Sequence, residues 1–112
     1  MVVESLKLVS LNVRGISNFH KRKTIYTWCR RKNADFSFLQ ETHSKTEIET
    51  QWKNEWGAGI IMSHGSSNSR GVAILIKEGV DYTLRSKIID ASGGYIILKV
   101  VIKDKICLEQ YL

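Results

Sequence analysis

The segments Leu11-Asn12-Val13-Arg14-Gly15 and Leu39-Gln40-Glu41-Thr42-His43 decide the fold, because each takes an apolar strand into polar residues at its end. The spacing between them accommodates one helix. Crossover connections between parallel strands are almost always right-handed, so both strand ends fall at the same edge of the sheet. In such sheets ligands bind beyond the carboxyl ends of the strands. We therefore expect Asn12 and Glu41 to meet at one edge.

The residues between these segments predict a helix. Ser17 or Asn18 can cap its start, and Ile25, Trp28 and Cys29 fall on one apolar face at helical spacing. The three consecutive basic residues at 30–32 stabilise the end of this helix, because positive charge interacts favourably with the negative end of the helix dipole. We expect the apolar face to pack on the sheet.

The rest of the chain predicts a second, short helix and a series of antiparallel strands. The capping-box pattern of residues 44–47 begins that helix, and Ile48 and Trp52 anchor it. Apolar runs separated by turn-like segments predict strands at residues 60–62, 71–77, 82–89, 95–102 and 106–111. The fold class is therefore α+β: one strand-helix-strand unit followed by antiparallel strands, with helices on one face.

Length and composition indicate one small globular domain. The chain has 112 residues, of which 43% are hydrophobic and 25% charged. Its net charge of +6 favours an acidic partner, with nucleic acid ahead of a membrane; a merely soluble basic surface is the alternative. No transmembrane helix or secretory signal is expected. The two cysteines lack metal-ligand spacing, so we expect free thiols and an intracellular location, nuclear or cytoplasmic.

The polar strand ends have a chemical interpretation. A carboxylate such as Glu41 suits Mg²⁺, while the amide of Asn12 can donate to a phosphate oxygen or an attacking water. Arg14 can add bidentate phosphate binding. The alternative is that these residues serve turn geometry and solubility alone. The three histidines, His20, His43 and His64, are expected to be surface loop residues.

Three blocks in order resemble the endonuclease/exonuclease/phosphatase family, and within it the apurinic-type endonuclease domain of LINE-type (non-LTR) retrotransposons. They are Val9-Ser10-Leu11-Asn12-Val13-Arg14-Gly15, Phe38-Leu39-Gln40-Glu41-Thr42-His43 and Arg70-Gly71-Val72-Ala73-Ile74-Leu75-Ile76. The resemblance implies a DNase I-like four-layer α/β sandwich, of which residues 1–112 are the N-terminal part. It also implies a Mg²⁺-dependent phosphodiester hydrolase that nicks DNA. Glu41 matches the family's metal-binding carboxylate, and Asn12 matches its catalytic, phosphate-contacting Asn.

The family pattern continues with segments that this sequence lacks: Tyr-Ala-Pro-Asn, Gly-Asp-Phe-Asn and a closing Asp-His pair. The family uses the later Asp and His for proton transfer and charge stabilisation. We therefore expect a truncated domain that is inactive alone. Arg14 and Arg70 are assigned to DNA binding, with DNA as partner and no membrane. A single half of the sandwich would leave apolar residues of strand 95–102 exposed, so self-association through that face is expected. They are Ile96, Leu98, Val100 and Ile102.

Two other functions stay open. The first is a nucleic-acid-binding or regulatory module without catalysis, which would use a basic surface. That surface consists of Lys21, Arg22, Lys23, Arg30, Arg31, Lys32 and Arg70. The second, a hydrolase of phosphoinositides or small phosphoesters, fits the block that begins at Arg70 less well.

Overall fold

The computed structural model describes residues 6–66, 68–102 and 104–111, with side chains described as far as residue 102. The elements in chain order are β1 (Leu8–Asn12), α1 (Phe19–Lys32), β2 (Phe36–Gln40), a 3₁₀ turn (Thr46–Ile48), α2 (Glu49–Trp56), β3 (Gly59–Ser63), β4 (Val72–Ile76), β5 (Thr83–Ile89), β6 (Tyr95–Ile102) and β7 (Asp104–Tyr111). The side chains of Cys107 and Tyr111 lie outside the described part, so the free thiol expected at Cys107 stays a prediction.

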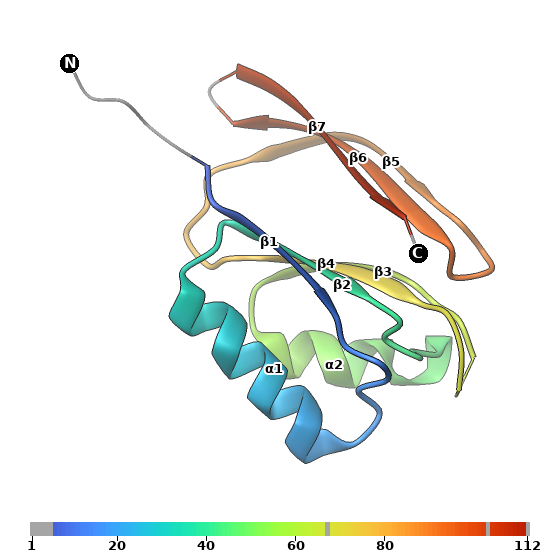
Figure 1. Ribbon diagram of the computed structural model, residues 1–112. Coiled ribbons are helices and arrows are strands. Elements are labelled where there is room, and N and C mark those ends of the chain that lie inside the picture. Colours follow the sequence, from blue (N-terminus) through green and yellow to red (C-terminus); the bar gives the residue numbers. More distant parts are fainter. Residues whose placement is uncertain (1–5, 67, 103, 112) are drawn as a thin grey trace.

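The strands form two sheets. One has the order β1-β2-β4-β3, in which β1 and β2 run parallel and the other pairs are antiparallel. The second is the antiparallel meander β5-β6-β7. Both helices cover one face of the first sheet, and the second sheet covers its other face (Figure 1). The predicted strand-helix-strand unit, the antiparallel strands and the placement of the helices are confirmed.

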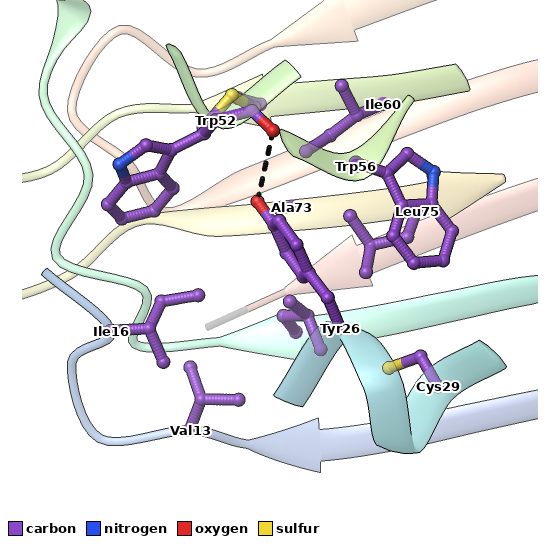
Figure 2. Packing of buried hydrophobic residues seen from close by; sticks show 11 residues of the cluster. Val13, Ile16, Tyr26, Cys29, Trp52, Trp56, Ile60, Ala73 and Leu75 are labelled. Atoms are coloured by element: carbon purple, nitrogen blue, oxygen red, sulfur yellow. Dashed lines mark hydrogen bonds between the residues drawn. The ribbon is translucent and has the colours of Figure 1, made fainter. Parts of the chain in front are cut away.

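The first core lies between the helices and the four-stranded sheet (Figure 2). Tyr26 of α1 and the two tryptophans of α2, Trp52 and Trp56, fill it. The Tyr26 hydroxyl donates to the Trp52 carbonyl at 3.4 Å, and the Trp56 indole donates to the Ile76 carbonyl at 3.1 Å. These bonds satisfy the polar atoms that large aromatic residues bring into a core.

The second core lies between the two sheets. Phe36 and Phe38 of β2 and apolar residues of β4 face Ile96, Leu98 and Val100, all three of which are fully buried. The expectation that these β6 residues form an exposed face is therefore wrong, and Ile102 packs against the same core. The meander folds back over the first sheet and buries them within the same chain, so this face cannot carry self-association.

Two local predictions need correction. Trp28 was expected on the buried face of α1, but it is 37% exposed; Tyr26 and Cys29 are the apolar residues that the helix buries. The capping box also does not form: a 3₁₀ turn without a side-chain cap precedes α2. The Ser44 hydroxyl bonds to His64 instead, at 2.9 Å. By contrast, Asn18 caps α1 as expected, accepting from the Lys21 amide.

Within the described ranges, no helix is both long and apolar enough to span a bilayer. Cys29 is free and buried, and burial raises the pKa of its thiol.

Candidate functional site

The loops that follow β1 and β2 run side by side at the carboxyl edge of the first sheet. Asn12 pairs with Gln40 in the parallel register. Beyond that pair three further backbone bonds join the loops. The Val13 amide donates to the Gln40 carbonyl at 3.0 Å, the Gly15 amide to the Glu41 carbonyl at 2.6 Å, and the Ile16 amide to the Thr42 carbonyl at 3.1 Å. The structure thus places the Asn12 and Glu41 segments together, as the parallel pairing of β1 with β2 requires.

The third sequence block joins the same edge. The Thr42 amide donates to the Gly71 carbonyl at 3.0 Å, and the His43 amide donates to the Arg70 carbonyl at 2.9 Å. All three blocks on which the family resemblance rests therefore meet at one place, although they are dispersed along the chain.

This edge has an unusual backbone. Arg14, Glu41, His43 and Arg70 all have positive φ, between 50° and 63°. Non-glycine residues rarely adopt this conformation, and such strain gathers at functional sites. Gly15 also has positive φ, and a Cβ there would collide with the His43 ring. The surrounding structure therefore holds these residues in backbone conformations that are unfavourable for them in isolation.

The side chains at the edge leave polar groups available. The Asn12 carbonyl oxygen accepts from the Arg14 amide at 3.1 Å, so its amino group points away from that turn. In the described part of the chain, neither this amino group, nor the Glu41 carboxylate, nor the Arg14 guanidinium has a hydrogen bond or ion pair. Asn12 and Arg14 are exposed, and Glu41 is half-buried. The edge thus offers a donor, an anion and a cation to a ligand.

A divalent cation fits this edge through Glu41 alone. Mg²⁺ is commonly bound by one or two carboxylates, with waters and substrate phosphate completing its shell. Among the residues described, no group of three or more His, Cys, Asp or Glu side chains could enclose a metal ion.

Arg70 has its side chain directed at the second sheet. Its Nε donates to the Ser92 carbonyl at 2.7 Å, and its guanidinium lies 3.8 Å from the Asp90 carboxylate. The Gly71 amide also donates to the Gly93 carbonyl at 3.0 Å. Arg70 is still 48% exposed, but it joins the site loops to the turn between β5 and β6.

Sequence reasoning missed the role of Arg22. It was counted as part of a basic surface, but it is 2% exposed: Nε and Nη2 pair with both Glu55 oxygens, at 2.6 and 2.9 Å. Nη1 donates to the Ile16 and Ser17 carbonyls, which belong to the loop after β1. Arg22 lies four residues before Tyr26 and seven before Cys29, so the three residues share one face of the helix. This spacing in the sequence could have indicated that Arg22 is buried.

His64 was also misplaced, because it is not a free loop residue. Its Nδ1 lies 2.9 Å from the buried Ser44 hydroxyl, and its Nε2 lies 2.9 Å from the Glu49 carboxylate. The hydrogen bond with His64 lowers the pKa of Glu49. His64 thereby ties the β3–β4 loop to the start of α2 and to the chain just after Glu41. No local sequence pattern signals this contact.

Comparisons with known proteins bear on this arrangement. Residues 9–111 match the model of the Endonuclease/Exonuclease/phosphatase family. The chain is 31% identical over 74 residues to the Transposon TX1 uncharacterized 149 kDa protein of Xenopus laevis. This match covers 66% of the chain and 6% of the Xenopus protein.

Two solved structures have a similar fold, each with a TM-score of 0.66. An AP endonuclease from Archaeoglobus fulgidus is 23% identical, and the match covers 96% of this chain and 41% of the endonuclease chain. TDP2 from Caenorhabditis elegans is 17% identical, and the match covers 93% of this chain and 34% of the TDP2 chain. The chain thus spans less than half of either structure, and the DNase I-like fold expected from the resemblance is confirmed. With its three characteristic blocks gathered at one sheet edge, the chain belongs to the endonuclease/exonuclease/phosphatase family.

Proposed function

We propose that this chain supplies the Asn12 and Glu41 part of a Mg²⁺-dependent site that hydrolyses phosphodiester bonds in DNA. The observation that carries the proposal is the convergence of the three blocks at one sheet edge, where the segments of Glu41 and Asn12 are joined by backbone hydrogen bonds and the Asn12 oxygen is held by the Arg14 amide. Likeness to a transposon protein and to an AP endonuclease supports DNA as the substrate and a retrotransposon as the source. Such a substrate agrees with an intracellular, nuclear or cytoplasmic, location.

Each residue has a role that follows from its chemistry. Glu41 would hold Mg²⁺ through its carboxylate; an ion held there would polarise the phosphoryl group and lower the pKa of a water. The Asn12 amino group donates to a non-bridging phosphate oxygen and orients the phosphate. Arg14, exposed and without an acidic partner in the described chain, forms charge-assisted bonds to a neighbouring phosphate.

The metal role of Glu41 is tested with Mn²⁺ as a paramagnetic probe in NMR spectra of the 112-residue chain. Mn²⁺ is expected to broaden the amide signals of residues 12–15 and 41–43 at low occupancy, and excess Mg²⁺ is expected to reverse the effect. Glu41→Gln should abolish this selective broadening. Glu47→Gln, which removes an exposed carboxylate from the nearby 3₁₀ turn, is the matched control and should preserve it. Broadening that survives Glu41→Gln would contradict the assignment.

Turnover is tested separately with supercoiled plasmid and Mg²⁺. The family resemblance predicts no nicking by residues 1–112 alone. Nicking abolished by both Glu41→Ala and Asn12→Ala would show that this stretch turns over without further residues. Nicking that survives both substitutions would discard the proposed site, while salt-sensitive DNA binding without nicking would favour the binding-module alternative.

A further inference from the structure

The outer face of α1 carries a hollow that the site above does not use. It has a volume of about 310 Å³ and is lined by Lys23, Thr24, Thr27, Trp28 and Arg31. The opposite face of the same helix packs Tyr26 and Cys29 into the first core. The helix α1 leads away from the loop that follows β1 (Figure 1), and none of the residues that line the hollow belongs to the Asn12 or Glu41 segment.

The exposed tryptophan in this hollow has no role in the core. Of the three tryptophans in the chain, Trp52 and Trp56 are 3% and 7% exposed, whereas Trp28 is 37% exposed. The Lys32 ammonium lies over the Trp28 ring, 5.4 Å from its centroid, so one face of the indole carries a cation. An indole surrounded by cations at a surface is a platform on which nucleic-acid bases stack.

The charge of α1 is of one sign. The helix contains six basic residues and no acidic one. Arg22 is neutralised by Glu55, and Arg30 donates to carbonyls at the end of α2, which leaves the cations around the hollow. Within the described residues, Lys23 and Arg31 have no acidic partner. They are eight positions apart, about 12 Å along the helix axis, with Thr27 between them.

We propose that this hollow binds single-stranded nucleic acid, with a base stacked on Trp28 and backbone phosphates bound by Lys23 and Arg31. The Thr27 hydroxyl adds a hydrogen-bonding group along the same stripe, whereas the Thr24 hydroxyl donates to the His20 carbonyl at 3.0 Å. Charge alone would suit an acidic peptide equally well, but an exposed indole between two cations favours a ligand that alternates planar bases with phosphates. The site is independent of Glu41 and of the proposed hydrolysis.

Tryptophan emission provides a local readout. With a short oligothymidylate in EDTA, the emission of Trp28 is expected to be quenched, while the buried tryptophans contribute a constant background. Trp28→Ala should abolish the quenching and weaken binding, measured by anisotropy of a labelled oligonucleotide, by about fivefold or more. Because Trp28 is exposed and alanine favours helices, this variant is expected to keep its fold, which circular dichroism checks.

The phosphate contacts are tested by salt dependence. The double variant Lys23→Ala with Arg31→Ala should lower the slope of log affinity against log salt by about 1.4, since each contact to a single strand contributes about 0.7. The control Lys87→Ala with Lys99→Ala removes the same charge from exposed positions on the second sheet and should leave the slope unchanged.

Several results would overturn the proposal: no quenching, unchanged affinity in Trp28→Ala, or an equal loss in the two double variants. Competition by polyglutamate as strong as that by oligothymidylate would show binding by charge alone and would equally reject it. These outcomes differ from a failure of the catalytic proposal, because Mn²⁺ broadening reports on Glu41 and quenching reports on Trp28.

Discussion

At the scale of single residues, Asn12 uses its side-chain oxygen for its own backbone, while its amino group is the donor that we propose for a ligand. Its side-chain oxygen accepts from the Arg14 amide and closes a turn, which leaves the amino group as a donor at the sheet edge. A turn of this kind is a sufficient structural reason for an Asn at a strand end. The proposed catalytic role differs from this structural role only in its use of the amino group.

Asn12→Asp should separate these roles. The carboxylate still accepts from the Arg14 amide, so thermal stability should stay near that of the unsubstituted chain, whereas Asn12→Ala should lose about 1 kcal/mol with the turn bond. Both variants should bind duplex DNA more weakly, Asp more so because its charge repels phosphate. Calorimetry and DNA titration measure the two effects. Undiminished DNA binding by Asn12→Asp would argue that Asn12 is a turn residue only.

At the scale of elements, Arg22 clamps α1 to α2 and to the loop after β1. Its guanidinium bonds to Glu55 and to the Ile16 and Ser17 carbonyls, and it lies 4.8 Å from the centroid of the Trp52 ring. The loop so held leads from Gly15 into α1. The bonds from Arg22 to the Ile16 and Ser17 carbonyls hold the loop after β1 in place, although Arg22 itself does not lie at the sheet edge.

Glu55→Gln should destabilise the chain by about 2 to 3 kcal/mol, because the buried Arg22 guanidinium loses its counter-charge. Chemical unfolding at neutral pH measures the change. Gln51→Ala is the control: it removes a side chain that contacts Glu55 from an exposed position of the same helix, and it should cost well under 1 kcal/mol. An equal effect of the two substitutions would show that the Arg22–Glu55 pair contributes little.

The same pair predicts an acid dependence. The hydrogen bond from Arg22 lowers the pKa of Glu55 in the folded chain. The unfolded chain therefore binds a proton more readily, so the contribution of Glu55 is complete above about pH 4.3 and is lost as pH falls through the lowered folded pKa. Unfolding free energies measured across the acid range should fall more steeply for the unsubstituted chain than for Glu55→Gln. Parallel curves would exclude this contribution.

At the scale of the whole molecule, two sheets pack face to face, with the helices on the outer side of the first. Leu98 in the middle of β6 is fully buried in the core between the sheets, whereas Ile88 on β5 is 55% exposed. The apolar surface that remains outside therefore includes β5 rather than the inner face of β6.

Leu98→Ala should cost about 2 to 5 kcal/mol, because it opens a cavity in the core between the sheets. Ile88→Ala removes a similar side chain from the surface and should change stability by no more than about 0.5 kcal/mol. Urea unfolding of both variants compares them directly. A small effect of Leu98→Ala would mean that the second sheet does not pack on the first.

The sequence alone determined the strand-helix-strand unit, the meander and the adjacency of the Asn12 and Glu41 segments. These follow from local hydrophobic periodicity and from the parallel pairing of two strands joined by one helix, which act within short stretches of chain. Only the tertiary structure decided that β6 is covered by the first sheet, that Trp28 faces out, and that Arg22 and His64 are bonded within the protein. The reason is physical. The spacing of apolar residues along a helix or strand shows which of its faces is apolar, but not which other element packs on that face. A charge such as Arg22 becomes buried only where a partner, here Glu55, 33 positions away, is brought within bonding distance.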